Sequence, residues 1–137
     1  MTHKHSFLRR RQKALMFAAS LYVVALIVSH STLPALHVWV IAAVFSIIMN
    51  ATYVVEAYAA RRLLRTELSV ALVLIVASVL GVMWHPAFVI FAIFGHGTWD
   101  IAKHFGAGIP FFSWYTLSCF AVDMTYGLVL LVYFLGT

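Results

Sequence analysis

Residues 86–105 have the sequence Pro-Ala-Phe-Val-Ile-Phe-Ala-Ile-Phe-Gly-His-Gly-Thr-Trp-Asp-Ile-Ala-Lys-His-Phe, an apolar run that ends in charged and imidazole side chains. His96, Asp100 and His104 are spaced four residues apart, so on a helix they share one face. Charged side chains inside a membrane are rare, and they usually face other helices rather than lipid. The stretch therefore predicts a membrane-embedded helix with one chemically active face.

The composition is that of a membrane protein. Of the 137 residues, 64% are hydrophobic and only 9% are charged, whereas soluble domains carry about 25% charged residues. The length predicts a single domain over residues 1–137, with no room for a separate soluble one. The single cysteine, Cys119, excludes an internal disulfide and a Cys-rich zinc motif.

The chain has five apolar segments, several of which approach the roughly 20 residues that are needed to cross a bilayer. Trp84-His85-Pro86 ends the third segment, because proline disfavours helix in the residue before it. Glycines and Pro110 separate the last two segments. The basic cluster before the first segment resembles the start of a signal peptide, but residues 29–34 offer a poor cleavage site, which favours an uncleaved helix. The predicted helices cover residues 14–28, 36–60, 68–84, 86–105 and 112–135.

The positive charges determine the predicted number of crossings. With five crossings and a cytoplasmic N-terminus, all nine Lys and Arg residues fall on the cytoplasmic side, in agreement with the positive-inside rule. A four-helix alternative, with residues 68–105 as one span, would place Lys103 outside. The sequence thus predicts an all-α, five-helix transmembrane bundle with its C-terminus outside. The basic N-terminus fits lipid headgroups, and a nucleic-acid partner is not expected.

Three of the four carboxylates lie inside apolar segments, at Glu56, Asp100 and Asp123, while Glu67 lies at a predicted interface. A helical rise of about 1.5 Å per residue places Glu56 and Asp100 roughly 7–8 Å from the cytoplasmic edge, and His96 and Asp123 roughly 14–16 Å from it. Three segments thus carry polar groups in the same half of the membrane. This agreement predicts one shared pocket that opens toward the cytoplasm.

Further polar side chains lie on the same helix faces. Asn50 and Tyr53 precede Glu56 at steps of three residues, and Tyr126 lies on the carboxylate-bearing face of the last segment. We expect Asn50, Tyr53 and Tyr126 to position a ligand by hydrogen bonds. The glycines on both sides of His96 allow a neighbouring membrane helix to approach closely.

His96, Asp100 and Asp123 are candidate ligands of one divalent metal ion, with Glu56 as a further ligand or a base. Nitrogen and oxygen donors bind both Zn and Fe, so the residue types do not distinguish between the two metals. His104 is another candidate ligand, but roughly 12 Å along the helix axis separates it from His96, which favours a place among the lipid headgroups. Two other interpretations stay open: metal-free acid–base or proton-relay chemistry by the same residues, and a polar clasp between helices.

Haem and nucleotide cofactors are not expected. Bis-histidine haem needs facing histidines at equal depth on two helices, and no other predicted segment has a buried histidine to oppose His96. His30, His37 and His85 fall on the outer side, where interfacial loop histidines are common.

A class of small bacterial integral membrane proteins of unknown function has a pattern similar to His96-Gly-x-Trp-Asp100-x-x-x-His104 followed by Cys119-x3-Asp123-x3-Gly127. The resemblance covers roughly residues 95–127. In that class a second histidine often precedes the position of His104, where this chain has Lys103. The resemblance implies a multi-pass protein of the bacterial inner membrane and brings no assigned chemistry.

The leading hypothesis is a small membrane enzyme or binding protein with a polar pocket in its cytoplasmic half, acting on a lipid-soluble ligand. In this hypothesis Glu56, His96, Asp100 and Asp123 are the catalytic residues. The alternatives are a non-enzymatic accessory or scaffold subunit of a membrane complex, and an oligomeric proton- or ion-coupled transporter. The expected partners are membrane lipids, together with further copies of the chain or a membrane-complex subunit.

Overall fold

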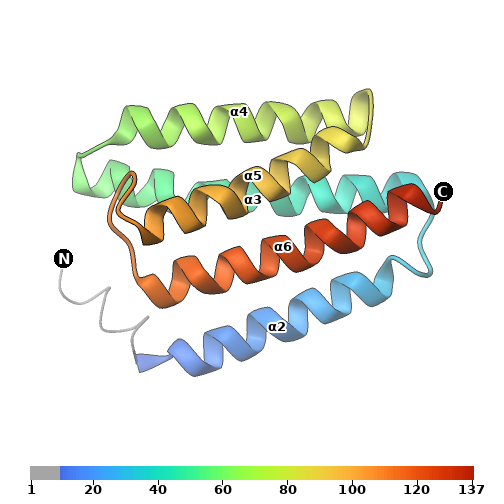
Figure 1. Cartoon of the computed structure of the whole chain (residues 1–137), viewed down its shortest axis with the longest axis horizontal. Helices are drawn as coiled ribbons and strands as arrows, with labels where there is room; N and C mark the ends of the chain where they lie inside the picture. Colours follow the sequence, from blue (N-terminus) through green and yellow to red (C-terminus); the bar gives the residue numbers. More distant parts are fainter. Residues whose placement is uncertain (1–9) are drawn as a thin grey trace.

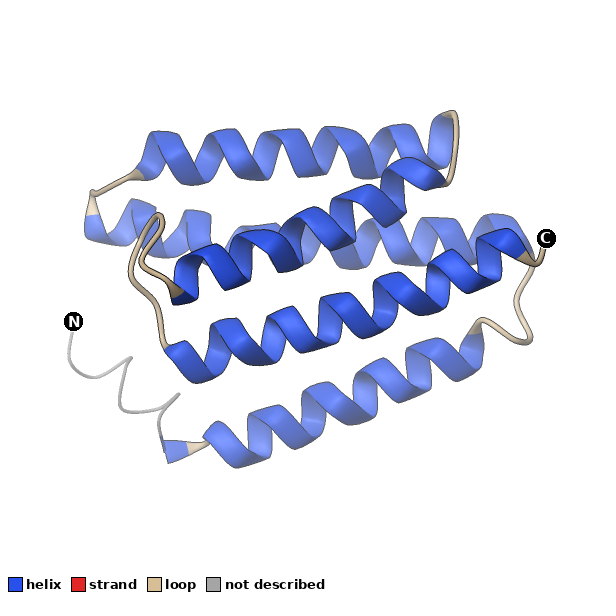
Figure 2. Cartoon of the chain, in the orientation of Figure 1, coloured by secondary structure: helices blue, strands red, loops and turns tan. Residues whose placement is uncertain are grey.

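The structure is a computed structural model that describes residues 10–137, and in this range it contains five α-helices and no strand (Figures 1 and 2). The all-α prediction is confirmed, and the observed helix ends lie within a few residues of the predicted ones. The largest difference is at the third segment, which begins four residues earlier than predicted. The helices are α2 Gln12–Ser29, α3 Ala35–Ala60, α4 Leu64–Met83, α5 Ala87–His104 and α6 Ser113–Leu135.

All five helices run between the same two ends of the bundle (Figure 1). The start of α2, the α3–α4 connection and the α5–α6 connection lie at one end, and the C-terminus lies at the other. Every Lys and Arg among the described residues is at or near the first end, as the charge pattern predicts, while Lys4 and Arg9 lie outside the described residues. That this basic end is cytoplasmic stays a prediction.

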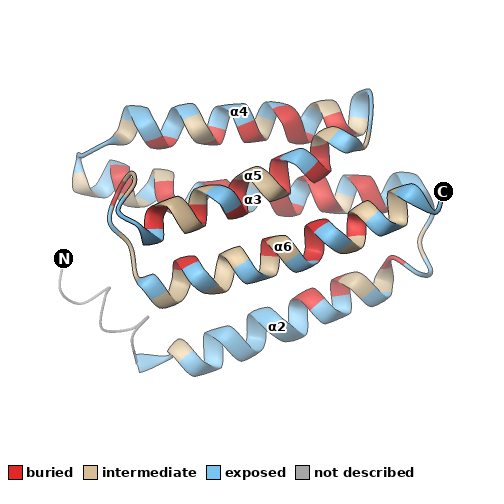
Figure 3. Ribbon diagram, in the orientation of Figure 1, coloured by how far each residue is buried: buried red, intermediate tan, exposed pale blue. Residues whose placement is uncertain are grey.

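Four helices, α2, α3, α4 and α6, are long and apolar enough to cross a membrane, which indicates a multi-pass membrane protein. Helix α5 is not among them, because its second half carries His96, Asp100, Lys103 and His104. Its packing compensates for this, since α5 lies against α4 and α6 and also contacts α3. Many large apolar residues are exposed instead, including Phe17, a pattern typical of a lipid-facing surface. Figure 3 shows exposed positions along the outer faces of the helices.

Glycines allow α5 to approach both of its main neighbours. At Gly81 on α4, an added Cβ would clash with Val89, so these two helices meet almost backbone to backbone. At Gly127 on α6, an added Cβ would lie 2.8 Å from the ring of Phe94. Small residues at membrane helix interfaces permit this close packing. Helix α5 is therefore clamped on two sides, which holds its polar face in a defined position.

Helix α2 is the most loosely held element. It packs by its backbone against α6 alone, and within its span only Val23 and Leu26 are buried (Figure 3). Side-chain contact with α3 comes from Tyr22, whose ring stacks on Phe45 at a centroid distance of 6.4 Å. The other four helices form the compact unit, and α2 lies at its edge.

Candidate metal centre

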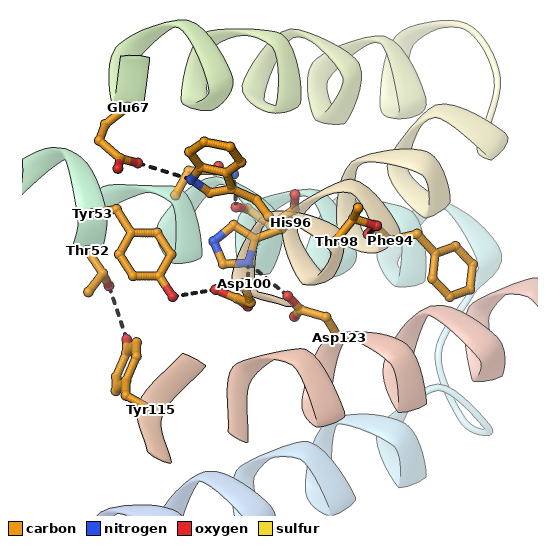
Figure 4. Close-up of polar contacts among 12 residues, drawn as sticks. Thr52, Tyr53, Glu67, Phe94, His96, Thr98, Asp100, Tyr115 and Asp123 are labelled. Carbon is orange, nitrogen blue, oxygen red and sulfur yellow. Dashed lines mark hydrogen bonds and ion pairs between the residues drawn. The ribbon is translucent and has the colours of Figure 1, made fainter. Parts of the chain in front are cut away.

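Three buried side chains converge between α5 and α6. His96 and Asp100, one turn apart on α5, meet Asp123 from α6, and one potential ligand atom of each lies within 4.8 Å of the other two (Figure 4). All three residues have at most 3% of their surface exposed. The prediction that these residues meet is therefore confirmed. The candidate ligands come from two helices, α5 and α6, whereas the sequence predicted a pocket shared by three.

The imidazole of His96 lies between the two carboxylates. Its Nδ1 is 2.8 Å from Oδ2 of Asp123, a hydrogen bond, and 3.3 Å from Oδ2 of Asp100. A single Nδ1 proton can be donated fully to only one of them. Tyr53 of α3 completes this arrangement, because its hydroxyl donates a hydrogen bond to Oδ1 of Asp100. Its ring also stacks on the imidazole, with 5.9 Å between the centroids.

Among the described residues, three polar atoms of the cluster are buried without a hydrogen-bond partner: Nε2 of His96, Oδ2 of Asp100 and Oδ1 of Asp123. Buried polar atoms are nearly always paired, and each unpaired one costs about 1–3 kcal/mol. The two carboxylate oxygens lie on the Nδ1 side of the imidazole, where they could share a partner with Nδ1, whereas Nε2 is on the opposite edge of the ring. A cation is the partner that two carboxylates and an imidazole have in common.

Gly97 is the local reason that the two helices can bring these groups together. A Cβ at this position would lie 3.0 Å from the Cβ of Asp123 and 2.6 Å from Cε of Met124. Without a side chain at position 97, the backbone of α5 lies directly against the turn of α6 that carries Asp123. The expectation that glycine beside His96 permits close helix approach is thus confirmed.

A second buried polar group lies near the basic end and was not predicted as a site. Glu67 of α4 was placed at an interface, yet it is buried and forms an ion pair with Lys103 of α5. The same carboxylate accepts hydrogen bonds from the Ile109 amide at 2.7 Å and from Nε1 of Trp99 at 3.1 Å. Lys103 also donates to the Ile109 carbonyl at 3.2 Å. Because these polar groups are paired, this cluster is a structural clasp that joins α4, α5 and the loop before α6.

The clasp reaches the metal-binding candidates through Tyr53. The ammonium group of Lys103 lies 4.3 Å from the centroid of the Tyr53 ring, which favours a cation–π interaction. The signal that was missed in the sequence is that Glu67 and Lys103 lie near the same end of two consecutive helices. Antiparallel packing of those helices brings the two charges together.

Other predicted site residues lie elsewhere. Glu56 is half-buried on α3, and within the described residues no hydrogen bond or ion pair joins it to the cluster. Asn50 is buried but donates its amide hydrogen bond to the Ser46 carbonyl of its own helix, at 2.8 Å. His104 is exposed, with its ring edge against Phe105, and does not belong to the three-residue group. The prediction that His104 lies at the rim agrees with this position, whereas the alternative that it is a metal ligand does not.

Tyr126 also faces away from the cluster. It is fully buried, and its hydroxyl hydrogen-bonds Nε2 of His30 at 2.7 Å. His30, which follows α2, was expected to be an interfacial loop residue, but only 5% of its surface is exposed. This burial lowers the pKa of His30 below its ordinary value of 6.5. The pair fastens the end of α2 to α6 rather than positioning a ligand at the cluster.

Comparison of the chain with protein-family models, with curated proteins and with solved structures finds no match. The resemblance of residues 95–127 to a class of bacterial membrane proteins therefore stays a prediction.

Proposed function

We propose that this protein is a small membrane enzyme that binds one divalent metal ion, Zn or Fe, through His96, Asp100 and Asp123 and acts on a lipid-soluble substrate. The observation that carries the proposal is the convergence of three buried ligand atoms from two helices. The charge pattern favours a basic end that faces the cytoplasm, and the resemblance of residues 95–127 to small bacterial membrane proteins favours the bacterial inner membrane.

The distances between the donor atoms suit a shared ion. Zn–N and Zn–O bonds are about 2.0–2.2 Å long, so neighbouring donors on a tetrahedral ion lie roughly 3.3 Å apart. Nδ1 of His96 lies 2.8 Å and 3.3 Å from the nearer oxygens of Asp123 and Asp100. Small side-chain rotations would adapt these separations to an ion. The nitrogen and oxygen donors agree with either metal.

Charge balance supports the same interpretation. Two ionised carboxylates in a low-dielectric interior repel each other, and each loses its hydration on burial. Neutral His96 leaves the cluster with two negative charges, which a divalent cation would balance. The clasp of Glu67 and Lys103 is balanced within the chain, whereas the cluster contains no Lys or Arg partner among its hydrogen-bonded neighbours in residues 10–137.

The chain supplies three ligands, which leaves room on the ion for an oxygen of the substrate or a water molecule. A bound ion at this place would polarise a substrate carbonyl or lower the pKa of bound water. Tyr53 holds Asp100 by its hydrogen bond and covers one face of the imidazole. Such partners fix the orientation of a ligand side chain and exclude water from the site.

A metal-free acid–base pair is the second candidate, and the hydrogen bond between His96 and Asp123 is the observation that favours it. In this case His96 would carry a proton that the two carboxylates stabilise. The two candidates differ in one measurable property, because the metal-free pair functions without any bound ion.

Metal analysis of detergent-purified protein after loading with zinc or with iron(II) under anaerobic conditions separates them. We expect about one ion per chain in the wild type and very little in the His96→Ala, Asp100→Asn and Asp123→Asn variants. Glu56→Gln and His104→Ala are the matched controls and should retain the ion. Helix content by circular dichroism shows whether each variant is folded. A folded wild type that binds neither metal would overturn the metal centre and leave the two metal-free interpretations, the acid–base pair and the polar clasp between helices.

A further inference from the structure

An apolar pocket of about 300 Å³ lies outside the cluster, between α2, α3 and α6. Its size is at the lower end of the range for small-molecule sites, which suits one aliphatic chain better than two. The loosely packed helix α2 forms its outer wall. The lining residues are Leu15, Met16, Ala19, Tyr22 and Val23 of α2, Phe45 and Met49 of α3, and Trp114, Tyr115, Ser118, Cys119 and Val122 of α6.

The inner wall of this pocket separates it from the metal-binding candidates. Within residues 10–137, α3 and α6 make no close backbone contact, and side chains close the gap between them. Tyr115 of α6 bridges it by a hydrogen bond of 3.2 Å to the hydroxyl of Thr52 on α3 (Figure 4). The ring of Tyr115 lies 6.4 Å from that of Tyr53, which in turn bonds Asp100. Two side chains in series, Tyr115 and Tyr53, thus connect the pocket to Asp100 of the cluster.

Trp114, which lines the pocket, also carries an unused hydrogen-bond donor. Its Nε1 is buried beneath the pocket surface and has no hydrogen-bond partner among residues 10–137, so an occupant would reach it after a turn of the indole ring. An indole N–H only donates, so its natural partner on an occupant is an oxygen atom. Trp114 and Tyr115 lie in the first turn of α6, at the basic end of the pocket. The carbon-lined remainder runs along α2 and α3 toward Val23 and Phe45.

We propose that this pocket binds the aliphatic chain of a single-chain lipid with an oxygen-bearing end, such as a long-chain fatty acid. The oxygen end lies beside Trp114 and Tyr115 and reaches the metal centre when the hydrogen bond between Tyr115 and Thr52 opens. The tail lies between α2, α3 and α6. This assignment rests on the proposed function and names its substrate class.

A second apolar groove, of about 420 Å³, lies between α4 and α5 and provides an internal control. Bulk lipid would enter both grooves without preference. None of the residues that line the second groove belongs to the cluster or hydrogen-bonds a member of it: Val73, Val76, Ala77, Leu80, Ala87, Phe88 and Phe91. A preference for the first pocket would therefore reflect its link to the site.

Photolabelling with a diazirine derivative of palmitic acid, on zinc-loaded full-length protein in micelles, measures this preference. Ala19→Phe fills the proposed pocket and Ala87→Phe fills the control groove, and both alanines are exposed on their helices. Each methylene group that is excluded from an apolar site weakens binding about fourfold, so blocking two of them predicts a loss of roughly 15-fold. We expect labelled peptides from α2 and α6, with labelling reduced by Ala19→Phe and retained in Ala87→Phe. Equal labelling of both grooves, or labelling that Ala19→Phe leaves unchanged, would overturn the assignment.

Competition tests the oxygen-bearing end. Unlabelled palmitic acid should suppress labelling of the pocket at lower concentration than hexadecane, and this advantage should shrink in Asp123→Asn. Equal competition by both compounds would contradict the assigned orientation. Zinc content, measured on the same preparations, distinguishes the two failures. A folded protein that binds neither zinc nor iron(II) refutes the proposed function, whereas a metal-bound protein without selective labelling refutes the lipid assignment.

Discussion

Gly97 of α5 and Asp123 of α6 lie so close together that a Cβ at position 97 would be 3.0 Å from the Cβ of Asp123. The separation of the two helices at this level therefore determines whether His96 reaches the carboxylate of Asp123. The Cβ of Asp123 is bonded directly to the backbone of α6, so it can move away from a methyl group at position 97 only if the helix itself moves. Position 97 thus couples helix packing to the geometry of the candidate metal centre.

Gly97→Ala should displace α6 and weaken zinc binding without removing any ligand. Overpacking of a tight interface costs about 1–3 kcal/mol. Zinc affinity, measured by competition with a fluorescent chelator, should fall by roughly tenfold or more, as for other changes that misplace ligands. Gly95→Ala is the matched control, because an added Cβ there meets only the flexible tip of Leu74 on α4. Equal affinity in the two variants would show that Gly97 does not set the site geometry.

Tyr53→Phe should lower zinc affinity by about 10- to 100-fold, the usual effect of removing a hydrogen bond to a metal ligand. The change removes the hydroxyl that bonds Asp100 but keeps the ring that stacks on His96. Tyr58→Phe on the same helix is the control, since that side chain is exposed. The same chelator competition gives both affinities. An unchanged affinity in Tyr53→Phe would mean that the hydrogen bond does not orient Asp100.

Breaking the clasp should destabilise the fold and leave the metal stoichiometry intact in molecules that remain folded. Lys103→Met leaves the buried Glu67 carboxylate without its counter-charge, which costs about 3–5 kcal/mol. Adding Glu67→Gln removes the stranded charge while keeping an acceptor for Ile109 and Trp99, so the double variant should be more stable than Lys103→Met alone. Unfolding by sodium dodecyl sulfate measures this order, with exposed Arg65→Met as a control. A double variant that is less stable than either single one would contradict the description of a neutralised pair.

The burial of His30, which disfavours its charged form, predicts a pH dependence of stability. The folded chain has a lowered pKa at His30, so between that value and 6.5 the unfolded chain binds more protons than the folded one. The stability that comes from keeping His30 neutral in the folded chain is complete above pH 6.5 and is lost as the pH falls below 6.5 toward the lowered pKa. We expect the melting temperature to decrease in that range, and to decrease less in His30→Gln. Exposed His37→Gln should behave as the wild type, and a His30→Gln profile identical to that of the wild type would contradict the prediction.

The sequence predicts the helices well because the apolar segments are long and the breaks contain proline or glycine. Most of the cluster could also be predicted from the sequence, for a related reason. His96 and Asp100 share a helix face, and depth arithmetic placed Asp123 near the level of His96. Matching depth does not tell which way a side chain faces around its helix. Glu56 therefore entered the predicted site, although the structure leaves it half-buried and outside the cluster.

The sequence did not predict two side-chain pairs, Glu67 with Lys103 and His30 with Tyr126, because both depend on how the helices pack. Glu67 and Lys103 each looked like ordinary interfacial charges, and only the packing of α4 beside α5 makes them partners. Tyr126 lies one turn from Asp123, but its long side chain extends to His30 at the end of α2. Hydrogen bonds between segments that are distant in sequence depend on tertiary packing, which local spacing does not encode.

X-ray absorption fine structure at the zinc edge tests the central claim most directly, since it counts the donor atoms around the ion. Zinc-loaded protein should show only nitrogen and oxygen neighbours at about 2.0–2.2 Å, including one imidazole, and no sulfur shell. The shell should change in Asp123→Asn and stay the same in Cys119→Ser and His104→Ala. A sulfur neighbour, a second imidazole, or a spectrum that Asp123→Asn leaves unchanged would contradict a metal centre formed by His96, Asp100 and Asp123.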